Sequence, residues 1–283
     1  MKSNRIAFAA STLLLFVAPG VLAATDPAPA AAPQESLPDA KTLIEKHIEA
    51  IGGREKLKQV KSRSSSSTIE VPAAGVKGTT KVYQAPPAYM FTETEIGGIG
   101  KVAQGFDGEY AWETSVMTGP RLLSGKEADI YARSAKFNAE IDYLEDYKSL
   151  KTIGSDTVGG AAVYVVEMID KNGISEKRLY DQQSGLLVGL RTKMPSQMGE
   201  IDSETTLSDY KEVGGIRVPY KVKVKVMGSE IITEVQNAEI NGDVPPSCFE
   251  PPADVKSLIE KQKAKDSAPA SAPATKDAPE GGK

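Results

Sequence analysis

The stretch RVPYKVKVKV, residues 217–226, decides the fold class. Along it, apolar side chains alternate with cationic ones: Val218, Tyr220, Val222, Val224 and Val226 against Arg217, Lys221, Lys223 and Lys225. Because successive side chains of a strand point to opposite faces, this period of two predicts a strand with one apolar and one solvated face. Pro219 lacks a backbone donor, which favours a place at a sheet edge or near the start of the strand.

Segments of the same kind lie on both sides of this strand and are joined to it by short turns. Residues 202–210 precede it, across Gly214-Gly215, and 230–240 follow it, across Gly228-Ser229. The further predicted strands are 79–84, 89–95, 101–106, 110–113, 162–169, 175–180 and 186–191, with tight turns at Asp107-Gly108 and Asn172-Gly173. Turns this short permit antiparallel pairing and leave no room for crossover helices, so we predict a mainly β protein with an antiparallel meander.

Two helical elements are predicted beside the sheet. The first has an apolar face formed by Leu43, Ile44, His47, Ile48 and Ile51, ends at Gly52-Gly53 and is followed by a shorter helix at 54–60. The second starts at Ser124–Glu127, which has the sequence of a capping box, and continues with Ile130, Phe137, Ile141 and Leu144 on one face. A single sheet this long has to curl, and what the helices leave uncovered on its concave apolar face is a cavity.

The two ends of the chain differ in composition from its middle. Residues 1–23 have the layout of a secretory signal peptide: Lys2 and Arg5, an apolar run at 6–17, and small residues before a cleavage point near Ala23. We therefore expect export and a periplasmic mature protein. An Ala/Pro-rich disordered linker is predicted for 24–36, one β domain for 37–255, and a disordered low-complexity tail for 256–283.

Charge and residue usage argue against several classes of function. Of the 34 Lys and Arg residues, two leave with the signal peptide, and the remaining 32 stand against 38 Asp and Glu, a mild acidity that disfavours nucleic acid as a partner. One cysteine, Cys248, excludes an intramolecular disulfide. One histidine, His47, lies on the apolar stripe of the first helix and is a packing residue more often than a ligand. We expect no metal and no cofactor.

The sequence contains no convincing catalytic constellation. It has no Gly-x-Ser-x-Gly elbow, and no second histidine to complete a triad. Ser208-x-x-Lys211 has the spacing of some acyl enzymes but lacks their companion motifs. The acidic run at 140–146 lacks the loop glycine and the regular ligand spacing of a calcium site. We therefore predict that the protein is not an enzyme.

A series of short motifs in the first half of the domain resembles the LolA-like superfamily of periplasmic lipoprotein carriers: Gly78, Pro86-Pro87, Phe91, Gly105-Phe106-Asp107-Gly108 and Trp112. The closing segment FEPPADV, residues 249–255, resembles the end of the same family. The resemblance covers most of 37–255 and implies a half-open β-barrel with N-terminal and lid helices. It also implies an interior that holds the acyl chains of a lipid or lipoprotein, with membrane assembly partners. The arginine that the family has just before the strand-linking proline is absent, since Gln84-Ala85 precede Pro86.

The apolar concave face is where we expect the ligand to bind. Its predicted lining is Met90, Trp112, Tyr164, Val166, Met168, Val222, Val224 and Val226, although each of these is also an ordinary core residue. Glu167 marks the opposite face of its strand as the solvated one. The predicted function is a non-catalytic binding protein for lipid or lipoprotein acyl chains, with a role in outer-membrane lipoprotein sorting. The alternative is a structural or sensory interaction module of the same shape with a filled interior.

Overall fold

The structure of the protein, a computed structural model, describes residues 36–98, 100–196 and 199–267. The predicted signal peptide, the predicted linker up to residue 35 and the predicted tail from residue 268 onward lie outside the described residues. The described residues from Leu37 onward belong to one compact unit.

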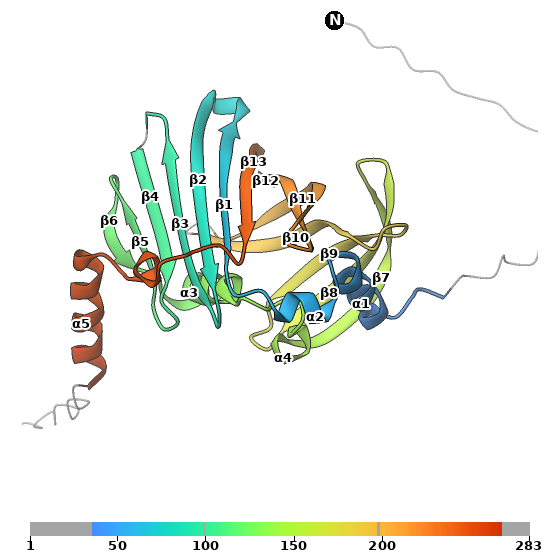
Figure 1. Ribbon diagram of the computed structural model, residues 1–283, viewed down its shortest axis with the longest axis horizontal. Helices are drawn as coiled ribbons and strands as arrows, with labels where there is room; N and C mark the ends of the chain where they lie inside the picture. Colours follow the sequence, from blue (N-terminus) through green and yellow to red (C-terminus); the bar gives the residue numbers. More distant parts are fainter. Residues whose placement is uncertain (1–35, 99, 197–198, 268–283) are drawn as a thin grey trace, which may run out of the picture. The chain divides into compact units, whose positions relative to one another are not determined.

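Within the described residues, thirteen antiparallel strands form one continuous sheet (Figure 1). They are β1 (Arg63–Val71), β2 (Val76–Ala85), β3 (Tyr89–Ile96), β4 (Gly100–Phe106), β5 (Ala111–Ser115), β6 (Gly119–Leu122), β7 (Tyr147–Val158), β8 (Ala161–Asp170), β9 (Ser175–Asp181), β10 (Leu187–Ser196), β11 (Gly199–Val213), β12 (Ile216–Val226) and β13 (Ser229–Ile240). Their order in the sheet is β6-β5-β4-β3-β2-β1-β13-β12-β11-β10-β9-β8-β7. Apart from β1 and β13, all neighbours are consecutive in the chain, which confirms the predicted meander.

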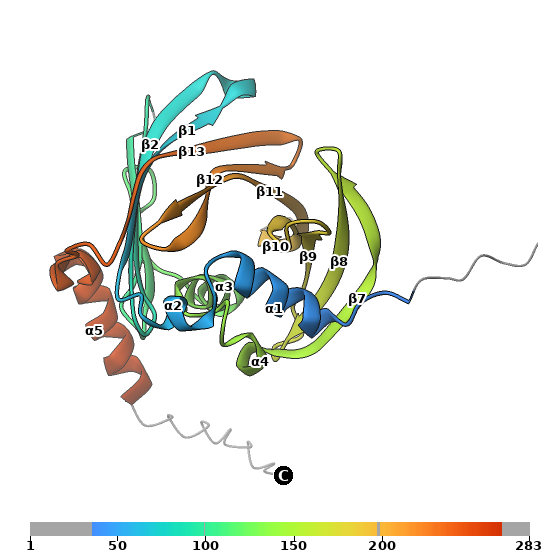
Figure 2. The ribbon, with the colours of Figure 1, turned by 45° about the vertical axis from the view of Figure 1, so that its right-hand side comes forward.

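The sheet curls, so that it has a concave and a convex face (Figure 2). The helices α1 (Ala40–Ala50), α2 (Arg54–Lys58) and α3 (Gly125–Ala135) lie on its concave side, and α5 (Ala253–Ser267) lies outside. The short elements are η1 (Pro72–Ala74), α4 (Tyr143–Asp146) and η2 (Pro246–Phe249). Because β6 and β7 stand at the two ends of the strand order and do not pair with each other, the curl stays open. The predicted half-open barrel is confirmed. None of the helices in the described ranges combines the length and the apolar run needed to cross a membrane.

The largest core lies under α1, on the concave side. This helix begins after Asp39, whose side chain accepts hydrogen bonds from the backbone N–H groups of Lys41 and Thr42. Its cluster includes Leu43, Ile44 and Ile48 of α1, Ile51 directly after this helix, Phe137, Ile141 and Tyr143 from the connection between α3 and β7, Val166 and Met168 of β8, Tyr180 of β9 and Ile216 of β12. The predicted apolar face of the first helix is confirmed. It joins segments that lie far apart in the sequence.

The strands from β3 to β6 are covered on both faces. On the concave face, Met90, Phe106 and Ala111 pack against residues of α3. On the convex face, Trp112 packs against Val255 and Ile259 of α5. Each helix thus protects one side of this end of the sheet from water.

The C-terminal boundary of the domain differs from the prediction. Residues 256–267, expected to belong to a disordered tail, are helical and form most of α5. The sequence of α5 is mainly polar, but Val255 and Ile259 lie one turn apart and both are buried. Two apolar side chains on one face are enough to dock the helix on Trp112.

The lid helix begins where predicted but is shorter. Ser124 precedes α3, yet its side chain makes no capping hydrogen bond, and Glu127 instead pairs with Arg121 (Nη2 to Oε1, 2.8 Å). The helix ends at Ala135, and the chain turns before α4. Phe137 and Ile141 therefore reach the core from the connection and not from the helix, and Leu144 is 57% exposed.

The two edge strands, β6 and β7, were not predicted from the sequence. β6 is four residues long and contains Pro120. β7 is longer, but its pairing with β8 shifts register between Tyr147 and Ser149 and again between Thr152 and Gly154. Such bulges break the period of two that identifies a strand. Pro219 lies in the part of β12 that pairs with β11 and not with β13, which confirms its predicted place near a strand start.

The motif that runs from Gly105 to Trp112 has a steric explanation. The two residues are opposite each other in the β4–β5 pair, and Trp112 is fully buried. A Cβ atom on Gly105 would collide with the indole ring of Trp112. In the turn between them, the Asp107 carboxylate accepts hydrogen bonds from the N–H groups of Glu109 (3.0 Å) and Tyr110 (2.7 Å). Glycine therefore lets the indole lie against β4, where α5 covers it.

Gly105→Ala is expected to destabilise the protein by about 1–3 kcal/mol, because the added methyl group displaces Trp112 and, with it, α5. Gly154→Ala is the matched control, since Gly154 also lies in a strand and an added Cβ meets nothing within 4 Å. We expect the control to change stability by no more than about 0.5 kcal/mol. Urea unfolding of both variants checks this. Equal midpoints would contradict the packing of Trp112 on Gly105.

Candidate ligand-binding site

A row of side chains crosses the middle of the sheet on its concave face. Arg63 of β1 lies opposite Gln84 of β2 on one side and Ile240 of β13 on the other. Directly opposite residues share a face, so these three side chains point the same way. Beside the row lies a cleft of about 160 Å³, lined by Val82, Val218, Val235, Ala238 and Ile240, with Pro219, Ser64 and Ser65, and by Arg63 and Gln84. We call it the apolar cleft.

A second cleft, of about 390 Å³, meets the first at Arg63 and Gln84, which line both. It lies between α3, the connection to β7, and strands β9 and β10. Its charged lining consists of the cations Arg63, Arg133, Lys136, Arg178 and Lys193 and the anions Glu140, Asp146 and Glu176. We call it the charged cleft. The concave face was expected to be apolar throughout, and this part of it is not.

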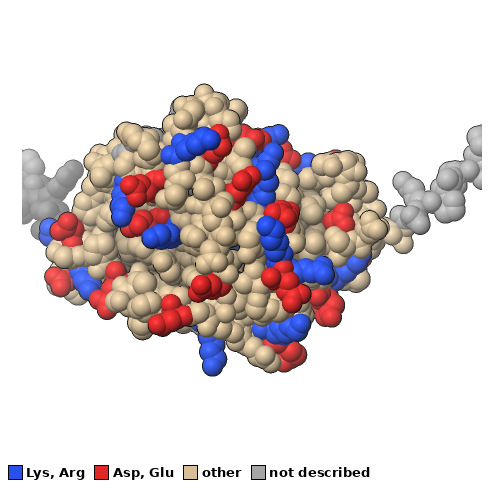
Figure 3. All heavy atoms as spheres, turned by 45° about the horizontal axis from the view of Figure 1, so that its top comes forward, with Lys and Arg blue, Asp and Glu red and all other residues tan. Residues whose placement is uncertain are grey.

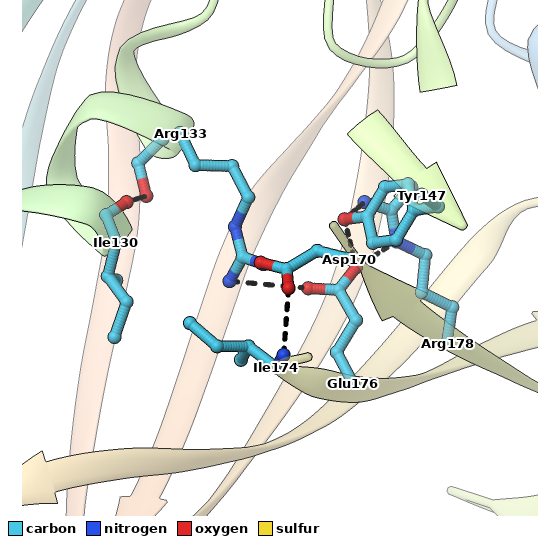
Figure 4. A network of polar contacts seen from close by, with 8 residues as sticks. Ile130, Arg133, Tyr147, Asp170, Ile174, Glu176 and Arg178 are labelled. Atoms are coloured by element: carbon cyan, nitrogen blue, oxygen red, sulfur yellow. Dashed lines mark hydrogen bonds and ion pairs between the residues drawn. The ribbon is translucent and has the colours of Figure 1, made fainter. Parts of the chain in front are cut away.

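Two arginines of the charged cleft belong to a buried network with two carboxylates (Figure 4). The Arg178 Nε–H and the Tyr147 hydroxyl both donate to Oε1 of Glu176, each at 2.7 Å. Nη1 of Arg133, on α3, donates to Oδ2 of Asp170 at 2.9 Å. The other oxygen of Asp170 accepts from the backbone N–H of Ile174 at 2.7 Å. The network fastens α3 to the hairpin of β8 and β9.

Electrostatics keep the central pair of this network charged. Burial alone would raise the pKa of Glu176, but Arg178, Tyr147 and Arg133 outweigh it and hold the pKa below its ordinary value. Burial alone would lower the pKa of Arg178, and Glu176 raises it well above the ordinary value. The two side chains are 7% and 15% exposed. Removing one partner would leave a buried, uncompensated charge, which is strongly destabilising.

Two further arginines contact the connection between α3 and α4. The guanidinium carbon of Arg63 lies 4.6 Å from the centre of the Phe137 ring, and its Nη1 is 3.6 Å from Oε1 of Glu140. Arg54 Nη1 donates to the carbonyl oxygen of Ile141 at 2.6 Å. The arginine that the family carries before its proline is absent from β2. The contacts of this chain with the connection come from Arg63 on β1 and Arg54 on α2.

The predicted lining residues of β12 lie on the expected face. The strand pairs with β11 without a register shift, so Val222, Val224 and Val226 share the face of Ile216 and Val218, which pack against the core under α1. All three valines are half-buried. The alternating lysines point the other way.

Two of the three predicted lining residues of β8 are fully buried, and none of the three lines the apolar or the charged cleft. Tyr164, Val166 and Met168 share the concave face, as predicted, and Val166 and Met168 are 0% exposed in the core under α1. The opposite face is solvated only in part, since Glu167 on it is half-buried. Val163 and Val165 are buried against Leu179, because the β7–β8 hairpin folds over this part of the sheet. An ion pair between Asp156 Oδ2 and Arg191 Nη1 (2.7 Å) closes that fold.

The other two predicted residues lie on opposite faces of the sheet. Met90 is buried on the concave face under α3, and Trp112 is buried on the convex face under α5. Neither lines the apolar or the charged cleft. The residues common to both clefts, Arg63 and Gln84, were not predicted. The one cue for Arg63 is that it is the only charged residue in the segment SRSSSSTI, residues 62–69.

In the described ranges, no group of three or more His, Cys, Asp or Glu side chains is placed to hold a metal ion. On the face of the molecule seen in Figure 3, acidic and basic side chains are interspersed, and neither sign forms a continuous patch.

The sequence matches no family model and no curated protein. Solved structures do match. A LolA superfamily protein from Nitrosomonas europaea aligns with a TM-score of 0.52 and 14% identity, over 76% of this chain and 99% of its own. The fold is that of the LolA superfamily.

Two further solved structures share the LolA-like fold. One is a DUF1329 family protein from Desulfovibrio piger, with a TM-score of 0.53 and 13% identity over 75% of this chain and 97% of its own. The other is a putative outer membrane lipoprotein-sorting protein domain from Vibrio parahaemolyticus, with a TM-score of 0.50 and 12% identity over 77% of this chain and 99% of its own. At these identities, likeness establishes the fold and leaves the cargo to be argued from the site.

His47 is part of the core beside this site. It is 6% exposed, and its Nδ1 accepts a hydrogen bond from the backbone N–H of Leu187 at 3.1 Å. Burial, together with the charge of Arg178, lowers the pKa of His47 to about 4, against an opposing hydrogen bond with the backbone of Gly185. The predicted packing role of His47 agrees with this environment, in which the imidazole is neutral.

Acidification is expected to destabilise the protein through His47. Its pKa is about 6.5 in the unfolded chain and about 4 in the folded protein. Between these values the unfolded chain binds a proton that the folded protein does not. Stability is therefore full above about pH 6.5 and is lost as the pH falls towards 4. We expect a loss of about 2 kcal/mol between about pH 7.5 and pH 5, measured by urea unfolding. His47→Asn, which keeps an acceptor for Leu187, should flatten this dependence. A loss of the same size in that variant would contradict the assignment.

Arg133→Met is expected to destabilise the protein by on the order of 3 kcal/mol, because Asp170 loses its cation while it stays buried. Arg121→Met is the control: Arg121 also pairs with carboxylates near α3, but it is 39% exposed. We expect that variant to lose at most about 1 kcal/mol. Urea unfolding measures both. If Arg121→Met proved the more damaging, the buried network would not be what holds α3.

Proposed function

We propose that the protein is a non-catalytic periplasmic binding protein that holds an apolar chain, from a lipid or a lipoprotein, on the concave face of its sheet. The observation that carries the proposal is the apolar cleft, whose aliphatic wall includes Val82, Val218 and Val235. Val218 continues along β12 into the half-buried Val222, Val224 and Val226. Together they form an aliphatic surface that the helices leave partly uncovered.

The sequence and the fold give further support. Residues 1–23 have the composition of a signal peptide, which supports a periplasmic location. The similar solved structures include a LolA superfamily protein and a putative outer membrane lipoprotein-sorting protein domain. A role in lipoprotein sorting is one specific form of this carrier function.

A second candidate function is an interaction module with a filled interior. The observation in its favour is the core under α1, where Val166 and Met168 are 0% exposed and the concave face is packed. In that case the apolar cleft is a packing defect, and the protein acts through its surface.

Binding of a neutral fluorescent dye, Nile red, and its displacement by dodecanoate distinguish the two. The carrier proposal predicts that about one dodecanoate molecule per protein displaces the bound Nile red. Val82→Trp should fill the apolar cleft and weaken binding about tenfold, which corresponds to the loss of roughly two buried methylene groups. The melting transition should change little, because Val82 is only half-buried and faces a cleft.

Lys81→Trp is the matched control, since Lys81 is the exposed neighbour of Val82 on the same strand and points to the convex face. It should leave binding intact. Absence of binding in the wild type, or unfolding of Val82→Trp with no effect of Lys81→Trp, would favour the interaction module.

A further inference from the structure

Arg63 has the weakest compensation among the paired cations of the charged cleft. Each of the others has a carboxylate oxygen at hydrogen-bond distance: 2.9 Å for Arg133 to Asp170, 2.9 Å for Lys136 to Asp146 and 2.7 Å for Arg178 to Glu176. Glu140 lies 3.6 Å from Arg63 and is itself 38% exposed. The Nε of Arg63 is buried without a hydrogen-bond partner.

This under-compensation has a definite chemical consequence. The guanidinium group of Arg63 carries a positive charge, although the side chain is only 18% exposed. A buried charge or donor without a partner costs free energy, and an anion that reaches it recovers that cost. The guanidinium group presents its donors in a planar fork that fits carboxylate and phosphate oxygens.

Gln84 adds a second donor at the same place. It lies directly opposite Arg63 on the neighbouring strand, and both residues line both clefts. The side-chain contact of its Nε2 is with the sulfur of Met90 at 3.6 Å, a weak acceptor. The amide is therefore free to donate to a ligand that sits beside Arg63.

The position of this pair between the two clefts determines the shape of the ligand. Polar donors stand at the boundary, and the aliphatic wall of Val82, Val218 and Val235 extends away from them. We propose that Arg63 and Gln84 bind the anionic head group of an acidic amphiphile, a carboxylate or a phosphate, while its hydrocarbon chain lies along the apolar cleft.

This assignment rests on the proposed function and specifies the class of lipid that binds. An acyl chain that is joined to a protein through an ester or amide has no anionic end. The pair therefore selects a free acidic lipid over the acyl chains of a lipoprotein. Glu140, the carboxylate nearest to Arg63, competes with the ligand for the guanidinium group.

The test compares dodecanoate, dodecyl phosphate, dodecanol and inorganic phosphate as competitors of Nile red. The wild type should bind the two anionic amphiphiles about tenfold more tightly than dodecanol. This is the gain in affinity expected from one charge-assisted hydrogen bond. Arg63→Met should abolish this preference, and Arg63→Lys should retain part of it. Glu140→Gln should increase it, because the competing carboxylate is gone. Glu145→Gln is the control, since Glu145 lies in the same connection but is 73% exposed and pairs with Lys136.

The outcomes separate the inference from the proposed function. If dodecanol binds as tightly as dodecanoate, the carrier function stands and the head-group assignment falls. If no amphiphile binds, the proposed function itself falls. If Arg63→Met and Glu140→Gln both weakened the binding of all amphiphiles by the same factor, Arg63 would act only by holding Phe137 and Glu140 in place. If inorganic phosphate displaced Nile red and the amphiphiles did not, the ligand would be a free anion and the assignment of an amphiphile would be wrong. The gain of affinity in Glu140→Gln does not depend on how well Arg63→Met folds.

Discussion

The packing of α1 into the curl of the sheet is the interaction on which the rest of the structure depends. Its apolar face meets side chains from the α3–β7 connection and from β8, β9 and β12, so one helix of eleven residues joins the beginning, middle and end of the domain. A curled sheet has a concave face too large for its own side chains to fill. α1 fills one part of that face, and α3 a second. The apolar and charged clefts lie in what remains.

Much of the fold is predictable from the sequence, because short turns and a strict period of two leave few alternatives. Val218 to Val226 identified both the strand and its apolar face. Prediction failed where the period is interrupted, as at the bulges of β7, or where too few residues carry it, as in the four residues of β6. In α5, two apolar side chains in a polar sequence gave no usable signal, although they are sufficient to dock the helix.

The candidate site was less predictable than the fold, for a physical reason. Sequence patterns distinguish the two faces of a strand, but they do not show which part of a face a helix will cover. Val166 and Met168 have the same pattern as Val222 and Val224, yet the first pair is sealed by α1 and the second is half-exposed. Nothing in the sequence distinguishes Glu176 and Arg178, which are charged and buried in a network, from charged residues on a solvated surface. Their partners come from Tyr147 and, through α3, from Arg133, and that proximity exists only in the folded chain.

The open curl leaves two strand edges, β6 and β7, with backbone groups that another chain could pair with. An exposed edge of this kind is a route to aggregation. β6 is short and carries Pro120, which has no N–H to offer a neighbouring strand. β7 is longer, but its two bulges distort the edge, and Lys148 and Lys151 lie exposed along it. A barrel can therefore remain half-open, with its concave face accessible to a ligand, and still resist polymerising edge to edge.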